Sequence, residues 1–196
     1  MITTQQHTEA FKTLIKNAEP YFLSDLYLNQ IVVTKKWSEH GSHLNECEEL
    51  FENMGFNPEK TLKCDLELKT MLTKWIPLRL RYITNEIEHE INCSTTIYRA
   101  ISIKPEKLQE TINKLKAAKT VSDFGCYWSS SEYVQPWGAK TDKGDKTIYI
   151  KMELPIEAVD IIETLRSRID FNNGDDEQEY NLKGCFPLKN FSITND

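Results

Sequence analysis

The hydrophobic pattern of this chain changes its period once along the 196 residues, just after Cys93. Up to that residue, apolar side chains recur every three or four positions, a spacing typical of helices that bury one face. Beyond it, apolar and polar residues alternate in segments rich in β-branched and aromatic side chains, which favours strands. Because a run of helices precedes a run of strands, the sequence predicts an α+β fold with a helical region over 1–94 and a strand-rich region over 95–196.

Three helical segments are expected in the first region. The first two are predicted from apolar stripes, and Gly55 lies where the second helix would end in a left-handed residue. The stripes consist of Phe11, Leu14, Ile15 and Ala18, and of Leu44, Cys47, Phe51 and Met54. The third helix is expected to begin near Asp65, to be interrupted by Pro77, and to resume from Leu80 to Ile91.

Four strands and two helices are predicted in the second region. The strands are expected over 95–103, 125–131, 147–154 and from 179 to about 193, the last with a break near Gly184. The helices are expected over 105–118, with Pro105 in the first turn, and from 155 to about 169.

Composition and charge limit the binding partners and the cellular location that can be expected. The net charge of −6 gives no general affinity for nucleic acid or for an anionic membrane. The start of the chain does not resemble a signal peptide, and no stretch approaches the roughly 18 apolar residues of a membrane span. The five cysteines include no CxxC pair, which suits reduced thiols. We expect a soluble protein in the cytoplasm of its producer or of a cell into which it is injected, without a membrane partner.

Arg99 occupies an unusual position in the first predicted strand. Alternation places its side chain on the same side as Ile97, Ile101 and Ile103. An unpaired buried charge is costly, so the guanidinium is expected to reach a carboxylate, the solvent at a strand end, or an anionic ligand. The planar fork of arginine suits phosphate particularly well.

Three consecutive serines follow an aromatic pair in the second predicted strand, as Tyr127-Trp128-Ser129-Ser130-Ser131. Serine is a poor strand former, so the run indicates hydroxyls used for hydrogen bonding, or else an edge strand that frays into a turn.

Four carboxylates crowd the stretch from Asn173 to Leu182. A strand that begins near Glu177 would point Glu177 and Glu179 the same way, about 6.5–7 Å apart. Asp175 and Asp176 would then lie in the preceding loop, where their charge tends to raise the pKa of both glutamates. The alternative is an ordinary solvated acidic turn.

Taken in order, these motifs resemble the Arg-Ser-Glu class of mono-ADP-ribosyltransferases. The resemblance runs from about residue 95 to the C-terminus and rests on Tyr98-Arg99, Trp128-Ser129-Ser130-Ser131 and Glu177-Gln178-Glu179. It implies a split β-sheet core that binds NAD as co-substrate without a metal, preceded by an N-terminal helical region. Two departures from the class are a serine at the middle position, where threonine is common, and a short loop before the glutamates.

The resemblance also implies a role for each residue. Glu179 would stabilise the cationic ribose, Ser129 would hold Glu179, and Arg99 would bind the phosphate or ribose region of NAD. Glu177 would orient and deprotonate the acceptor, and glutamate at this position is typical of enzymes that modify arginine. Further residues are expected at NAD (Ser131, Tyr133 and Trp137) and at the target (Phe171, Asp175 and Asp176). For Tyr133 and Trp137, ordinary core packing is the alternative.

The expected function is therefore transfer of ADP-ribose to an arginine of a target protein, by a bacterial toxin, an injected effector or a phage-encoded modifier of its host. An antitoxin or immunity protein is a candidate partner. A basic run keeps RNA or DNA open as the acceptor. That run consists of Lys69, Lys74, Arg79 and Arg81. An NAD glycohydrolase and a non-catalytic binding module are further alternatives. The spacing of His40, His43, Cys47 and Cys64 matches no standard zinc site, so no metal is expected.

Overall fold

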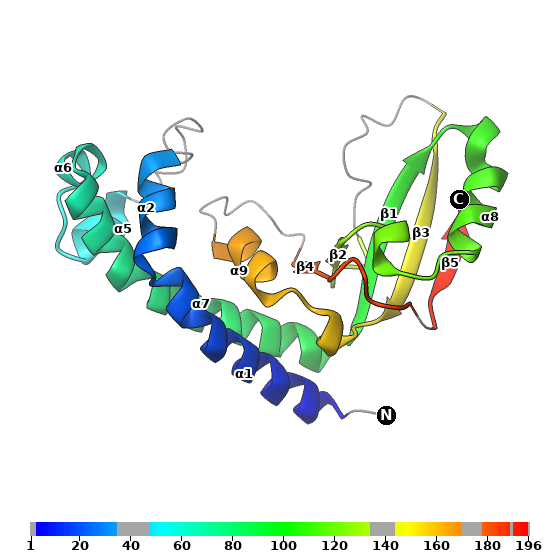
Figure 1. Cartoon of the computed structure of the whole chain (residues 1–196), viewed down its shortest axis with the longest axis horizontal. Helices are drawn as coiled ribbons and strands as arrows, with labels where there is room; N and C mark the ends of the chain where they lie inside the picture. Colours follow the sequence, from blue (N-terminus) through cyan, green and yellow to red (C-terminus); the bar gives the residue numbers. More distant parts are fainter. Residues whose placement is uncertain (1–2, 35–47, 134–143, 170–177, 189, 196) are drawn as a thin grey trace.

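The structure is a computed structural model, and it describes residues 3–34, 48–133, 144–169, 178–188 and 190–195. The molecule is elongated, with helices at one end and an antiparallel sheet at the other (Figure 1). Within the described residues, no helix combines the length and the apolar character needed to cross a membrane.

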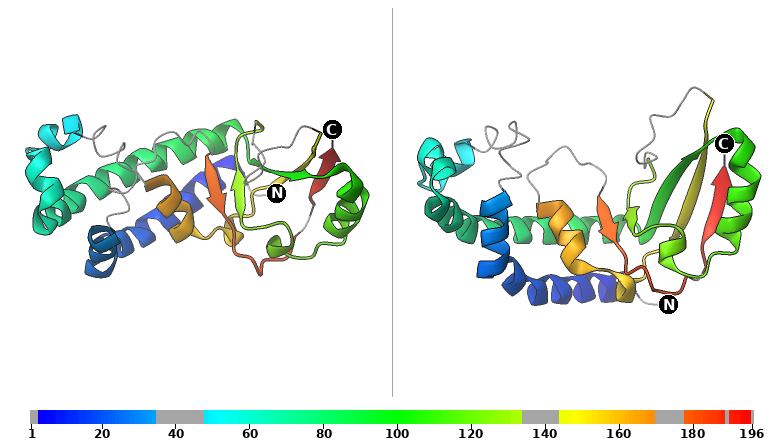
Figure 2. Two further views of the ribbon diagram at one scale, coloured as in Figure 1. Left: turned by 90° about the horizontal axis from the view of Figure 1, so that it is seen from above. Right: turned by 45° about the horizontal axis from the view of Figure 1, so that its top comes forward.

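Two long helices, α1 (Thr4–Phe22) and α7 (Asp65–Cys93), lie side by side along the molecule (Figures 1 and 2). A capping box between Thr3 and Gln6 starts α1 by satisfying backbone groups at the helix end. Three shorter helices gather at the end far from the sheet (Figure 1). These are α2 (Asp25–Thr34), α5 (Glu48–Asn53) and α6 (Pro58–Lys63).

Helix α7 continues through Pro77 for 29 residues, so the predicted interruption is wrong. Proline removes one helical hydrogen bond and costs about 3 kcal/mol in a helix interior. Trp75, Ile76 and Leu80 are nevertheless buried on both sides of it. Each such side chain contributes about 1.5–3 kcal/mol on burial, so tertiary packing outweighs the local cost.

The apolar stripes are largely confirmed where the structure describes them. Phe11, Ile15 and Ala18 are buried in α1, and Phe51 is buried in α5. Gly55 follows α5 with a left-handed φ of 80°, as predicted for a helix end. Leu44 and Cys47 lie outside the described residues. Helices α2 and α6 were not predicted, since neither presents a long periodic stripe.

The sheet has the strand order β4-β2-β1-β3-β5, and all of its pairs are antiparallel. Its centre is a full-length pairing of two eight-residue strands. The strands are β1 (Thr96–Ile103), β2 (Tyr127–Ser129), β3 (Lys146–Glu153), β4 (Glu179–Asn181) and β5 (Ser192–Asn195). Strand β2 joins β1 through one residue pair, Tyr98 with Ser129, so the strand pairing between the halves β4-β2 and β1-β3-β5 is limited to that pair.

Several elements of this region are shorter than predicted. Strand β2 covers three of the seven expected residues, and the segment 179–193 forms β4 and β5 on opposite edges of the sheet. Helix α8 (Leu108–Lys116) follows a 3₁₀ turn that begins at Pro105. Helix α9 (Ile161–Ile169) begins later than expected, because Asp160 caps it by accepting from the Glu163 amide at 3.2 Å.

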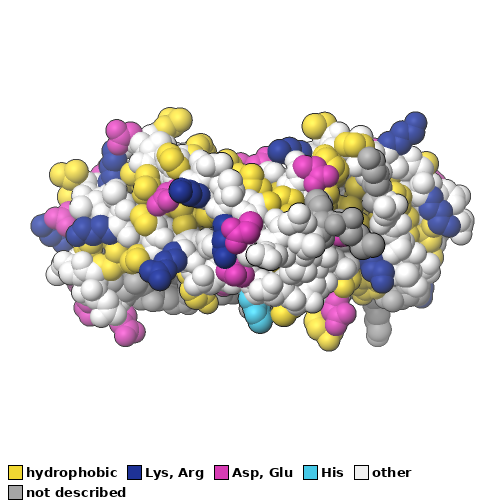
Figure 3. Space-filling model, turned by 90° about the horizontal axis from the view of Figure 1, so that it is seen from below, with side chains coloured by type: hydrophobic (Ala, Val, Ile, Leu, Met, Phe, Trp, Pro, Cys, Tyr) yellow, Lys and Arg dark blue, Asp and Glu magenta, His cyan; other side chains and the backbone are white. Residues whose placement is uncertain are grey.

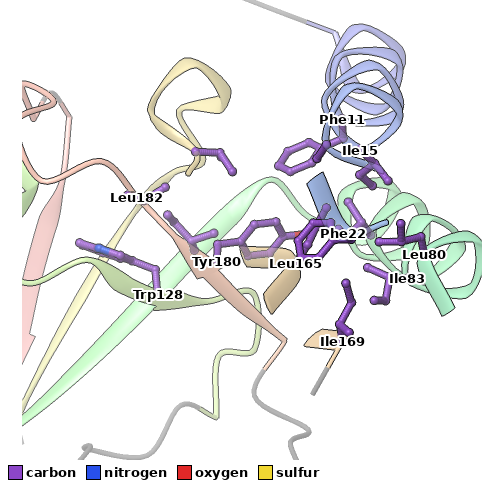
Figure 4. Packing of buried hydrophobic residues seen from close by; sticks show 14 of the residues in the cluster. Phe11, Ile15, Phe22, Leu80, Ile83, Trp128, Leu165, Ile169, Tyr180 and Leu182 are labelled. Atoms are coloured by element: carbon purple, nitrogen blue, oxygen red, sulfur yellow. The ribbon is translucent and has the colours of Figure 1, made fainter. Parts of the chain in front are cut away.

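One continuous cluster of buried apolar side chains joins the helices to the sheet. Helix α9 packs against α7, α1 and β4, although it belongs to the second half of the sequence. Figure 4 shows Phe11 of α1 beside Tyr180 of β4, and their ring centroids are 5.7 Å apart in an edge-to-face arrangement. The helical region therefore shares its core with the strands.

Replacing Phe11 by alanine is expected to lower the free energy of unfolding by about 3–5 kcal/mol, since the ring is 1% exposed and would leave a cavity. Because the core is shared, far-UV circular dichroism and tryptophan fluorescence should report the same midpoint in thermal unfolding. Leu26→Ala, at a side chain that is 77% exposed, is the control and should change stability by less than about 0.5 kcal/mol. Two separate transitions would contradict a shared core.

Candidate functional site

Three of the predicted site residues, Arg99, Ser129 and Glu179, lie on three adjacent strands. In the register of the sheet, Ser129 of β2 is paired with Tyr98 of β1 on one side and with Glu179 of β4 on the other. Arg99 follows Tyr98 directly along β1. Residues that are far apart in the sequence are thus brought to one level of the sheet.

Ser129 and Glu179 are direct cross-strand neighbours. Such pairs point to the same side of a sheet, with Cβ atoms about 4.5–5.5 Å apart, so both side chains leave the sheet on the same side. Ser129 is only 3% exposed, whereas Glu179 is half-buried. The Ser129 Oγ accepts a hydrogen bond from the Ser131 amide at 2.9 Å. This arrangement suits a serine that orients a carboxylate.

Arg99 leaves β1 on the opposite side from Tyr98, because successive strand residues alternate. It lies beside Ile150 of β3, on the isoleucine-rich side that the sequence predicted. Its Nη1 donates to the Tyr127 carbonyl, and its buried Nε has no hydrogen-bond partner among the residues that the structure describes. Burial lowers the pKa of Arg99, whereas the negative charge of Glu179 acts in the opposite direction. The charge among the isoleucines is therefore partly satisfied by a backbone oxygen and retains donor capacity.

Gly125 makes this position of Arg99 possible. It adopts a left-handed φ of 97°, which disfavours any side chain. A Cβ at this residue would also lie 2.5 Å from Nη2 and 2.8 Å from Cζ of Arg99. The loop before β2 thus needs glycine both for its backbone conformation and for the close approach of the guanidinium.

Ser130 has a different role from its neighbour Ser129. Its amide donates to the Gln178 carbonyl at 3.3 Å, and its hydroxyl contacts Gln178 Oε1 at 2.7 Å and Glu90 Oε2 at 3.1 Å. The hydrogen-bonding explanation of the serine run is confirmed by the Ser130 hydroxyl. The edge-strand explanation is wrong, because β2 ends at Ser129 but lies between β4 and β1.

The strand that carries Glu179 begins at that residue, which confirms the predicted start at 179 and contradicts a start near Glu177. Gln178 has a left-handed φ of 49°. Strand alternation requires extended backbone and therefore does not run through Gln178. Glu177 lies outside the described residues, as do four other predicted site residues. These four are Trp137, Phe171, Asp175 and Asp176.

A buried ion pair that the sequence reading missed lies directly behind Glu179. Arg168 of α9 donates to Glu90 of α7 through two bonds, Nη1 to Oε1 at 2.8 Å and Nη2 to Oε2 at 2.9 Å. Both side chains are less than one-tenth exposed. Tyr180 donates to the same Glu90 at 2.6 Å, and Arg168 Nε donates to the Glu179 carbonyl at 3.1 Å. Burial opposes the charge on Arg168, but the hydrogen bonds and attraction of Glu90 outweigh it and raise the pKa of Arg168.

One signal in the sequence could have pointed to this pair. Glu90 stands immediately before Ile91 and three residues after Ile87, within the buried stripe of α7. A carboxylate inside an apolar stripe requires a buried partner. No local pattern identifies that partner as Arg168, which is 78 residues away.

Two residues expected at the cofactor follow Ser130. Tyr133 is 80% exposed, so the alternative that it packs in the core is wrong. Ser131 is half-buried, and its hydroxyl accepts from the Tyr133 amide at 3.3 Å. These contacts form a tight turn directly after β2.

The basic run of α7 is largely committed to contacts within the protein. Lys69 forms an ion pair with Asp25 at 2.6 Å, and Lys74 lies 4.9 Å from the ring centroid of Phe56. Arg79 donates to the Arg168 carbonyl at 2.8 Å, whereas Arg81 is exposed. On the face seen in Figure 3, Lys and Arg side chains are interspersed with Asp and Glu side chains. The four residues therefore do not form a basic surface on which all four cations could bind a nucleic acid.

Among the residues that the structure describes, no group of three His, Cys, Asp or Glu side chains could hold a metal ion. His40, His43 and Cys47 lie outside the described residues, and the thiol of Cys64 is unpaired.

Comparison with known proteins identifies no relative, since no protein-family model, no curated protein and no solved structure matches this chain significantly.

Replacing Gly125 by alanine is expected to destabilise the protein by more than the roughly 1–2 kcal/mol cost of a left-handed alanine, because Arg99 must also move. Gly55→Ala is the matched control, since Gly55 has a φ of 80° and no atom near the added Cβ. Chemical denaturation of both variants, with and without Arg99→Ala, measures the difference. If Gly125→Ala costs no more than Gly55→Ala, the close approach has no energetic role.

Proposed function

We propose that the protein is an NAD-dependent mono-ADP-ribosyltransferase of the Arg-Ser-Glu class, which releases nicotinamide and transfers ADP-ribose to an acceptor. The observation that carries the proposal is the register of three strands, in which Ser129 is paired with both Tyr98 and Glu179. The single link between the two halves of the sheet agrees with the split core of that class. The sequence order of the motifs supplies the remaining support.

The proposed chemistry needs a carboxylate beside the ribose. When the bond between ribose and nicotinamide breaks, nicotinamide leaves with the bonding electrons and the ribose carbon becomes cationic. A fixed carboxylate stabilises this charge electrostatically. Glu179 supplies the carboxylate, and Ser129 beside it supplies a donor that holds its orientation.

Arg99 is suited to the anionic part of NAD. Its side chain is half-buried, its Nη1 donates to a backbone carbonyl, and its Nε has no hydrogen-bond partner within the described part of the chain. A phosphate group beside the guanidinium would neutralise a charge that burial disfavours.

The acceptor we favour is an arginine of a target protein. Glu177 would pair with the incoming guanidinium and accept its proton as the new nitrogen–carbon bond forms. Phe171, Asp175 and Asp176 are the candidate target contacts. Since the basic run of α7 is engaged within the protein, it gives little support to RNA or DNA as the acceptor. A toxin, an injected effector and a phage-encoded modifier of its host are the settings in which such an enzyme would act.

The proposal is tested by incubating the protein with NAD labelled in its adenylate part and with cell extract, then digesting separately with protease and nuclease. We expect nicotinamide release and label that only protease removes. Label lost to nuclease would identify a nucleic-acid acceptor, and nicotinamide release without transfer would identify a glycohydrolase.

Glu179→Gln should reduce nicotinamide release about 10²- to 10³-fold, because the cation loses its stabilising charge. Activity unaffected by Glu179→Gln would refute the catalytic assignment, and an inactive wild-type protein would favour a binding module.

Glu177→Gln is expected to separate the two half-reactions. Glutamine cannot accept a proton from the acceptor, so transfer to arginine should fall by about 10²-fold or more, whereas NAD hydrolysis by water should be largely retained. Both rates are measured on the same preparation, as nicotinamide release and as label incorporated into protein. Equal losses of hydrolysis and transfer would show that Glu177 has no special role toward the acceptor.

A further inference from the structure

We infer that the buried ion pair of Glu90 and Arg168 positions Glu179 and Ser129 for the reaction, so that helices α7 and α9 form part of the active site. The inference rests on the proposed function. It assigns a task to side chains that the sequence motifs of the Arg-Ser-Glu class do not include.

One guanidinium connects the helices to the backbone of the proposed catalytic carboxylate. Both terminal nitrogens of Arg168 are held by Glu90, which fixes the plane of the fork. The remaining donor, Nε, points to the carbonyl of Glu179 at 3.1 Å. Because the fork is rigid, the position of Glu90 on α7 determines where the Glu179 backbone lies.

Glu90 also holds the strand that carries Ser129. Its Oε2 accepts from Tyr180 at 2.6 Å and contacts the Ser130 hydroxyl at 3.1 Å, a hydroxyl that it shares with Gln178 Oε1. Ser130 and Tyr180 immediately follow Ser129 and Glu179. A single carboxylate is therefore bonded to the direct neighbour of each member of the proposed catalytic pair. Arg168 adds a further contact by lying over the Tyr180 ring, 4.7 Å from its centroid.

The sheet alone gives these residues little support. Strands β2 and β4 are each three residues long, β4 is at the edge, and the left-handed Gln178 precedes it. Stability is also a weak reason for this ion pair, since well-packed apolar side chains are often at least as stabilising as a buried pair of charges. Exact placement of Glu179 is the stronger reason, because a shift of about 1 Å can reduce an enzymatic rate roughly 10²-fold.

Arg168→Lys is the decisive variant, because lysine keeps the positive charge but loses the fork and the Nε donor to Glu179. For nicotinamide release below its unfolding temperature, we expect kcat to fall about 10- to 100-fold while the KM for NAD changes by less than about threefold. Hydrogen exchange of the Glu179–Asn181 amides should become faster. Arg166→Lys is the matched control on the same helix, since Arg166 forms an exposed pair with Glu163 at 2.8 Å, and both measurements should stay unchanged.

A second variant, Tyr180→Phe, tests the same role with a smaller change in case Arg168→Lys does not fold. Tyr180→Phe keeps the ring between Phe11 and Arg168 but removes the donor to Glu90, so it should lower kcat several-fold at a constant KM. Wild-type kcat in folded Arg168→Lys and Tyr180→Phe, or unchanged exchange of the Glu179–Asn181 amides, would overturn the positioning role. Hydrogen exchange can be measured whether or not the protein is an enzyme, so the two proposals fail in different ways. A wild-type protein that releases no nicotinamide would refute the proposed function. Unchanged exchange of the Glu179–Asn181 amides in Arg168→Lys would refute the anchoring of β4.

Discussion

The buried pair of Glu90 and Arg168 is the interaction on which the relation between the two halves of this protein depends. It joins α7 to α9, and through Tyr180, Ser130 and the Glu179 carbonyl it joins both helices to the edge of the sheet. A buried charge of this kind is costly unless its hydrogen-bonding capacity is met, and here four donor contacts converge on Glu90. These contacts fix the position of α7 and α9 relative to the edge of the sheet formed by β2 and β4.

Near Tyr98, the two sides of the sheet carry different proposed site residues. On one side, Ser129 and Glu179 are neighbours in a position where a donor can orient a carboxylate. On the other side, Arg99 lies among apolar side chains and against Gly125. Burial lowers the pKa of Arg99, and the negative charge of Glu179 acts in the opposite direction although alternation separates the two residues.

Much of the secondary structure could be predicted, because periodicity reports which side of an element is buried. The stripe of α1 and the alternation of β1 and β3 are examples. Prediction failed where tertiary contacts opposed a local rule. Pro77 lies inside α7 because buried neighbours compensate for its missing hydrogen bond, and β4 does not include Gln178 because that residue leaves the extended conformation.

The sequence by itself determined the order of helices and strands and the presence of Arg99, Ser129 and Glu179 in segments expected to be strands, since these depend on local composition and period. Only the tertiary structure decided that Ser129 is paired with Glu179 and that Glu90 selects Arg168, 78 residues away, as its partner. Such pairings arise from long-range packing, in which a residue's partner is set by the register and crossing of whole elements. A local pattern can indicate that a buried carboxylate needs a cation, but the folded chain alone determines which cation reaches it.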